Sequence, residues 1–117
     1  RRVRAEKLAE STQATVLLKG ARTVIASPIE KAPTAFNSTG NPGMASGGIG
    51  DTLSGLCGAI AGNKLSLYDA ACIGSWINGR AAENAVFNAG QSEQSLIASD
   101  LTAHYGAAFR DLLHGCF

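Results

Sequence analysis

The residues with most chemical potential in this sequence are a run of glycines followed by a carboxylate. Five glycines fall within the eleven residues from Gly40 to Gly50, and Asp51 follows directly. Because glycine loses more backbone entropy on folding than other residues, such a cluster indicates positive φ angles or close approach of a ligand. Where such a turn opens a helix, its amide groups form a site for a phosphate or a developing oxyanion. The residues of this predicted anion cradle are Gly47, Gly48, Ile49 and Gly50.

Asp51 has two interpretations. A carboxylate in the first turn of a helix is favoured by the helix dipole, so Asp51 could be only a cap worth about 0.5–2 kcal/mol. Beside an anion cradle, it also has the position of a general base for a hydroxyl that is being phosphorylated. A glycine-rich connector that merely turns the chain from sheet to helix is the alternative for the whole segment.

Other phosphate and nucleophile motifs do not fit the sequence. There is no G-x-x-x-x-G-K-[ST] segment, and the stretch from Gly48 to Leu53 lacks the third glycine of a dinucleotide-binding fingerprint. No G-x-S-x-G elbow is present. His104 and His114 have no third ligand nearby in the sequence, so we predict no metal site.

Three short apolar runs precede the glycines and predict strands at residues 14–18, 23–26 and 34–36. The first run is continuously apolar, which is typical of a strand covered on both faces of an α/β sheet. Lys19 follows this strand at its carboxyl end, where ligands of open α/β sheets bind. Considered without further information, Lys19 would be an ordinary surface lysine.

Helices are predicted on both sides of these strands. Residues 1–11 favour a helix, and the abrupt start suggests a fragment that lacks N-terminal partners. Apolar residues at helical spacing predict a helix over residues 51–61, and Ser66 is a cap for a long helix that ends near Asn88. Ser99 is the predicted cap of one last helix with a buried face. Trp76 is expected to be a core or interface aromatic.

Composition places the chain among globular intracellular proteins. Hydrophobic residues make up 45% and charged residues 16%, and the formal net charge is +1. We therefore expect no nucleic-acid or membrane partner. The cysteines Cys57, Cys72 and Cys116 are odd in number and have no C-x-x-C spacing, which favours a reducing compartment such as the cytoplasm. We interpret Cys57 as a small buried hydrophobic residue.

The segment from Asn41 to Gly55, Asn-Pro-Gly-Met-Ala-Ser-Gly-Gly-Ile-Gly-Asp-Thr-Leu-Ser-Gly, resembles the signature of the NAD(P)H-hydrate dehydratases. The resemblance continues through residues 19–21 and 65–71 and covers nearly the whole chain. It implies a ribokinase-like three-layer α/β/α sandwich, of which residues 1–117 would be the C-terminal part of a single domain, with a largely parallel sheet. Many members of the family have Thr or Ser where this chain has Ile49, so backbone amides would have to supply the cradle there.

The resemblance also implies a function, the ADP- or ATP-dependent dehydration of NADH or NADPH hydrate, with Mg²⁺ accompanying the nucleotide. Asp51 would be the base and the substrate contact, and Gly50 would touch the nucleotide phosphates. The family also implies a homo-oligomer, and the chain alone could be inactive. The nucleotide-binding residues implied by the resemblance are Lys19, Gly20, Ala21, Arg22, Thr23 and Gly50.

Two alternatives of other classes stay open. A vitamin or sugar kinase of the same superfamily, of the hydroxyethylthiazole kinase type, would use Asp51 in the same way. A non-catalytic nucleotide-binding module would use the cradle without a base.

Overall fold

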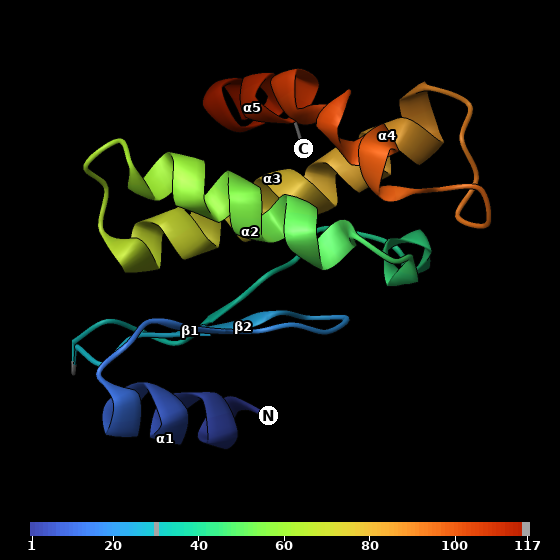
Figure 1. Cartoon of the computed structure of the whole chain (residues 1–117). Coiled ribbons are helices and arrows are strands. Elements are labelled where there is room, and N and C mark those ends of the chain that lie inside the picture. Colours follow the sequence, from blue (N-terminus) through green and yellow to red (C-terminus); the bar gives the residue numbers. More distant parts are fainter. Residues whose placement is uncertain (30, 116–117) are drawn as a thin grey trace.

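The chain is arranged in layers around a small sheet. The computed structural model describes residues 1–29 and 31–115. Figure 1 shows one helix on one face of the sheet and the other helices on the opposite face, which is the layering of the predicted α/β/α sandwich. The elements of the first two layers are α1 (Arg2–Thr12), β1 (Val16–Leu18), β2 (Val24–Ala26) and β3 (Ala35–Phe36). A 3₁₀-helix η1 (Pro42–Ala45), α2 (Ile49–Ala61), α3 (Leu67–Asn88), α4 (Ala98–Thr102) and α5 (Tyr105–His114) follow.

The sheet corrects one expectation. Its order is β1-β2-β3, and both pairs are antiparallel, with Leu17 opposite Ile25 and Ile25 opposite Ala35. The largely parallel sheet expected for the domain as a whole is therefore not seen in these three strands, which pair antiparallel. The physical reason lies in the connections between them, which are too short for the helical crossover that parallel neighbours require.

The middle helices agree closely with the sequence. α2 begins at Ile49, two residues before the predicted start, and ends at Ala61. Ser66 caps α3 as predicted, because its Oγ accepts a hydrogen bond from the Asp69 amide at 3.0 Å. Small residues on α3 let α2 approach closely. At Gly74, the Sγ of Cys57 occupies the space that a side chain would need.

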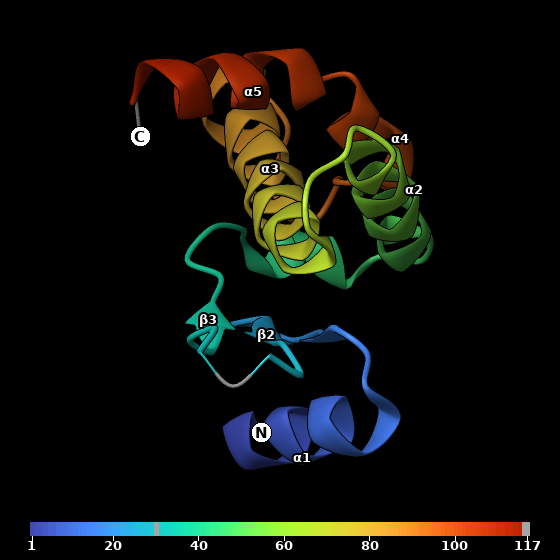
Figure 2. The ribbon, with the colours of Figure 1, turned by 90° about the vertical axis from the view of Figure 1, so that its left-hand side faces the viewer.

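The C-terminal helix corrects a second expectation. Instead of one helix capped by Ser99, the chain forms α4 and α5, and the N-cap of α4 is Ile97. Asp100 Oδ2 accepts a hydrogen bond from the Ile97 amide at 2.9 Å, so the side chain of Asp100, and not that of Ser99, caps the N-terminus of α4. The break lies at His104, and no glycine or proline marks it in the sequence. In Figure 2, α5 lies across α3 while α4 lies beside α2.

Two apolar clusters hold the layers together. The first joins α2, α3, α4 and α5 around Ile77 and Leu101, which are fully buried. Trp76 packs against this cluster, which confirms its interpretation as a core aromatic. The second joins α1 to the sheet through Ala5, Ala9 and Val24. No helix of the described ranges is long and apolar enough to cross a membrane.

Candidate functional site

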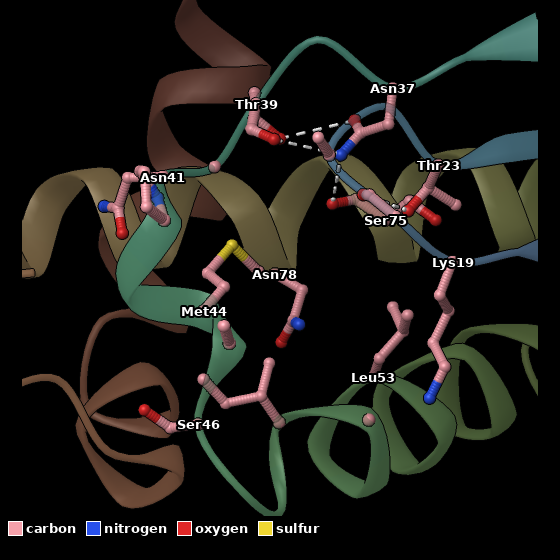
Figure 3. A pocket seen from close by; sticks show the side chains of 17 residues that line it. Lys19, Thr23, Asn37, Thr39, Asn41, Met44, Ser46, Leu53, Ser75 and Asn78 are labelled. Atoms are coloured by element: carbon pink, nitrogen blue, oxygen red, sulfur yellow. Dashed lines mark hydrogen bonds between the residues drawn. The ribbon is translucent and has the colours of Figure 1, made fainter.

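A cavity of about 770 Å³ lies between the sheet and the helices. Its walls come from the turn after β1, the loop at residues 37–46, the N-terminus of α2 and the middle of α3. Figure 3 shows Lys19 and Leu53 on one side of this space and Met44 and Asn41 on the other. The predicted site residues can be judged by their relation to this cavity.

Most of the residues predicted for nucleotide binding line the cavity, together with half of the predicted cradle. Arg22 does not line it and is exposed, and Asp51, Gly47 and Gly48 lie outside the lining. The cavity therefore brings the turn after β1 and the start of α2 together. The predicted site residues that line it are Lys19, Gly20, Ala21, Thr23, Ile49 and Gly50.

Lys19 and Gly50 meet directly across this wall. The Nζ of Lys19 occupies the space that a Cβ on Gly50 would fill. Lys19 follows β1 immediately, as predicted, and Gly50 is the second residue of α2. A cation therefore lies at the positive end of a helix, where both favour a bound anion.

The backbone angles at two positions of the glycine-rich segment, residues 40–50, favour glycine. Gly48, the N-cap of α2, has φ of 88°, and Gly40 has φ of 116°. Both values fall in the left-handed region, which residues with a side chain rarely adopt. At the start of α2 the amides of Asp51 and Thr52 donate to the Gly48 carbonyl, each at 3.1 Å.

The amides before Asp51 are differently placed. In the part of the chain that the structure describes, the N–H groups of Gly47, Gly48, Ile49 and Gly50 donate no backbone hydrogen bond. Those of Gly48, Ile49 and Gly50 belong to the four N–H groups that every helix N-terminus leaves without an intrahelical partner. They are available to an anionic ligand.

Asp51 lies in the first turn of α2 and its side chain is exposed. It adjoins Gly50, which lines the cavity, but it is itself outside the lining. An exposed carboxylate beside an anion cradle could accept a proton from a ligand that extends out of the cavity. It could equally share a Mg²⁺ ion with phosphates, since Mg²⁺ commonly binds through one or two carboxylates and substrate oxygens.

The turn after β1 is held by Arg1. The guanidinium donates to the carbonyls of Lys19 at 2.8 Å, Leu18 at 3.2 Å and Arg22 at 3.3 Å. It also fills the space beside Gly20 that a side chain would need. These three carbonyls are thus occupied by Arg1, which does not line the cavity.

The loop before η1 is attached along the backbone of α3. Asn37 Nδ2 donates to the Ser75 carbonyl at 3.1 Å, and Thr39 Oγ1 donates to the Trp76 carbonyl at 2.9 Å. Further along the loop, Asn41 Nδ2 donates to the Ala82 carbonyl at 3.1 Å. These bonds fix the cavity wall opposite Lys19 to a rigid helix.

Sequence reasoning missed the contribution of α3. Ser75 and Asn78 are buried, line the cavity and lie one helical turn apart. Asn78 Oδ1 accepts from the Tyr105 hydroxyl at 2.6 Å and from Thr52 Oγ1 at 3.4 Å. Burial raises the pKa of Tyr105, so this hydroxyl stays a donor. Polar residues on the buried face of an alanine-rich helix were the signal that could have revealed them.

A polar cluster on the outer side of α3 serves the packing of α5. Arg80 Nε donates to Asp111 Oδ2 at 2.8 Å, and Arg80 Nη1 forms an ion pair with Glu83 Oε2 at 3.2 Å. The Asn84 amide at 3.1 Å and the Arg80 guanidinium hold the pKa of Asp111 below its usual range. Glu83 also accepts from the Gly40 amide at 3.0 Å, which ties this cluster to the cavity loop.

Cysteines and metal-ligating residues form no further site in residues 1–29 and 31–115. Cys57 and Cys72 are free thiols, and burial raises the pKa of both. Cys116 lies outside the described residues. Within the described ranges no three His, Cys, Asp or Glu side chains are grouped as they would be around a metal ion.

The family model for NAD(P)H-hydrate dehydratase matches residues 1–103. The chain belongs to the NAD(P)H-hydrate dehydratase family. This confirms the resemblance based on the glycine-rich segment.

Curated proteins with similar sequences belong to the same family. The chain is 42% identical over 108 residues to the bifunctional NAD(P)H-hydrate repair enzyme Nnr of Moorella thermoacetica, and the match covers 92% of this chain and 20% of the relative. It is 44% identical over 99 residues to the Escherichia coli enzyme of the same name, with 83% and 18% covered. The ADP-dependent (S)-NAD(P)H-hydrate dehydratase of Neisseria meningitidis is 41% identical over 70 residues, which are 60% of this chain and 23% of that one. The chain thus spans about a fifth of the length of these dehydratase-family proteins.

Solved structures of the dehydratase family share the fold. The ADP/ATP-dependent NAD(P)H-hydrate dehydratase of Bacillus subtilis, co-crystallized with ATP and Mg²⁺, superimposes with a TM-score of 0.83 at 29% sequence identity. The superposition covers 94% of this chain and 38% of the Bacillus chain. The same enzyme soaked with CoA gives a TM-score of 0.83 over 94% and 39%.

Proposed function

We propose that this chain is the C-terminal part of a ribokinase-like domain that repairs hydrated NADH or NADPH by nucleoside-phosphate-dependent dehydration. The observation that carries the proposal is the meeting of Lys19 and Gly50 at the cavity wall, directly beside Asp51. Membership of the dehydratase family supports the reaction class. One relative is an ADP-dependent dehydratase, and the Bacillus subtilis dehydratase was co-crystallized with ATP and Mg²⁺. Both support ADP or ATP as the nucleotide.

Each group has a role in this proposal. The ammonium of Lys19 and the free amides at Gly50 bind the terminal phosphate of ADP or ATP. Asp51 removes the proton of the hydroxyl on the hydrated ring while that oxygen attacks the terminal phosphorus, and the bridging P–O bond breaks so that AMP leaves from ADP, or ADP from ATP. The ring C–O bond of the phosphate ester then breaks and releases inorganic phosphate, and the neighbouring ring carbon loses a proton to water, which restores the double bond. A Mg²⁺ ion on the nucleotide would neutralise charge between the phosphates and Asp51.

A kinase of the same superfamily is the competing function. It would use the cradle and Asp51 for the first step and would then release a stable phosphate ester. The match of residues 1–103 to the dehydratase model favours repair over this alternative.

The deciding experiment uses the protein expressed from its complete gene, with hydrated NADH and either ADP or ATP. The dehydratase regenerates the absorbance of reduced nicotinamide and releases inorganic phosphate in equal amounts. Hydroxyethylthiazole with ATP is the parallel substrate for the kinase. Phosphorylation of the thiazole without cofactor repair would replace the proposal with the kinase, and nucleotide binding without turnover would replace it with a binding module.

A further inference from the structure

The floor of the cavity carries two polar side chains that the proposed reaction does not yet use. Ser75 and Asn78 are 3% and 1% exposed and face the cavity from α3. Buried polar groups almost always have hydrogen-bond partners, so an unsatisfied one indicates a ligand. The partners of these two residues therefore decide what the floor can bind.

Ser75 has a vacant hydroxyl. Within residues 1–29 and 31–115, its Oγ is a buried side-chain oxygen without a hydrogen-bond partner. Its own carbonyl is already engaged by Asn37 Nδ2 at 3.1 Å. Leaving a buried hydroxyl unpaired is unfavourable, so a ligand atom that pairs with it gains affinity.

Asn78 is oriented by its neighbours. The Tyr105 hydroxyl donates to Oδ1 at 2.6 Å, and Thr52 Oγ1 lies 3.4 Å from the same oxygen. This fixes the oxygen branch of the amide toward α2 and α5. The Nδ2 branch has no partner in the described part of the chain, and it remains a donor for a group in the cavity.

The surroundings of the floor select a neutral ligand group. Met44, Ile49 and Leu53 line the same cavity with apolar side chains, whereas the cationic Lys19 lies at the wall by Gly50. A phosphate is favoured at that wall because charge is costly in an apolar pocket. An uncharged ring with acceptor atoms satisfies both the apolar sides and the polar floor.

We propose that Ser75 and Asn78 form a hydrogen-bonding subsite for a neutral nitrogen heterocycle, with Tyr105 as the residue that positions the Asn78 amide. This inference rests on the proposed function, since both molecules in that reaction carry such a ring. One is the adenine of the nucleotide and the other is the hydrated nicotinamide of the substrate. With phosphates held at Lys19 and Gly50, the ring of the bound molecule enters the floor.

The test uses Ser75→Ala and Asn78→Ala in the protein expressed from its complete gene. Asn88→Ala is the matched control, because Asn88 lies on the same helix, is exposed and does not line the cavity. Ser75→Ala removes a hydroxyl without a protein partner, so the melting temperature is expected to stay equal or rise. Ligand binding is expected to weaken by about 5- to 50-fold in both cavity variants, and to remain unchanged in the control.

Two measurements identify the ring. If adenine occupies the floor, both cavity variants bind ADP more weakly than the parent protein does in calorimetry. Their ratio of affinities for ADP and inosine diphosphate is then also smaller than that of the parent. If the hydrated nicotinamide occupies it, KM for hydrated NADH rises while ADP affinity is kept. Tyr105→Phe should shift the same parameter to a smaller extent, because the Asn78 amide can then turn over.

The negative outcomes are separate for the two proposals. The subsite alone would be overturned if the parent protein repairs cofactor and both the Ser75→Ala and Asn78→Ala variants behave like it. In that case the affinity for ADP, the preference for ADP over inosine diphosphate and the KM for hydrated NADH would all stay within twofold of the parent values. If Asn78→Ala fails to fold, Ser75→Ala and Tyr105→Phe decide the question. A parent that neither binds ADP nor repairs cofactor would overturn the proposed function, and this subsite with it.

Discussion

The ammonium group of Lys19 lies over the backbone of Gly50, in the space that any larger residue at Gly50 would claim. The contact joins the end of β1 to the first turn of α2. Gly50 lies inside a helix, where alanine has a higher helix propensity than glycine. Glycine at this position therefore makes the helix less stable than alanine would. In the proposed site, the absence of a side chain at Gly50 leaves room for the ammonium group and the phosphate, so a substitution at Gly50 should affect stability and binding in opposite directions.

Gly50→Ala should stabilise the fold and impair the site. The helix gains up to about 1 kcal/mol from the loss of glycine, and the flexible end of Lys19 can move aside. The displaced ammonium and the new methyl group obstruct the phosphate, so nucleotide affinity should fall about tenfold or more. Gly55→Ala is the control, since a Cβ there meets nothing within 4 Å. Chemical denaturation and calorimetry on both variants measure the two effects, and equal affinities would exclude Gly50 from the site.

Lys19→Ala should weaken nucleotide binding more than it slows turnover at saturation. A phosphate contact made equally in the ground state and the transition state changes KM and leaves kcat nearly constant. We expect KM for the nucleotide to rise about tenfold and kcat to stay within about threefold. Lys7→Ala on the exposed side of α1 is the control. Steady-state kinetics decide the matter, and an unchanged KM would remove Lys19 from the phosphate site.

Gly79→Ala should destabilise the protein by loosening the cavity loop. A Cβ at Gly79 would lie 2.7 and 2.8 Å from the carbonyl carbon and oxygen of Thr39, and backbone atoms cannot move aside cheaply. We expect a loss of about 1–3 kcal/mol in the free energy of unfolding. Gly106→Ala on α5 is the control, because a Cβ there has open space. Urea denaturation compares them, and equal stability would show that the loop tolerates displacement.

The elements that the sequence predicted well are those with strong local signals. Ser66 has a side-chain oxygen three residues before a free amide, and it caps α3 as expected. The glycine density correctly indicated positive φ angles, which occur at Gly40 and Gly48. Each of these features depends on a few neighbouring residues.

The features that the sequence did not reveal depend on distant residues. The break at His104 follows from packing of α4 beside α2 and of α5 on α3, and no local residue announces it. Antiparallel pairing of β1 with β2 was not predicted, because the expectation of a largely parallel sheet concerned the whole domain. The part of the cavity formed by α3 was missed because Asn78 is held by a hydrogen bond from Tyr105. That residue is distant in the sequence, so no local pattern shows the contact.

Stability should fall in acid partly through Asp111. The Asn84 amide and the Arg80 guanidinium lower its folded-state pKa, so the native protein holds the charged form more tightly than the unfolded chain does. The resulting stabilisation is complete above the unfolded pKa of about 3.9 and is lost as pH falls through the lower folded value. Asp111→Asn should therefore cost roughly 1 kcal/mol at neutral pH, with the difference shrinking below about pH 4. Thermal unfolding across pH tests this, and a pH-independent difference would contradict it.

Asp51→Asn should give a folded, nucleotide-binding protein with almost no turnover. Asparagine keeps the size of the side chain and its capping ability, so the fold should survive. It removes the base, which should lower kcat by roughly 10²–10⁴-fold. Nucleotide affinity should persist or increase, because a carboxylate next to phosphates repels them and an amide does not.

Asp69→Asn is the matched control for this experiment. Asp69 is also an exposed acidic residue in the first turn of a helix, and it does not line the cavity. Both substitutions remove a favourable interaction with a helix dipole, worth about 0.3–1 kcal/mol, so melting temperatures should fall by similar small amounts. Turnover should fall only for Asp51→Asn. If Asp51 merely caps α2, both variants will repair cofactor within a few-fold of the parent, and the role of Asp51 as base will be excluded.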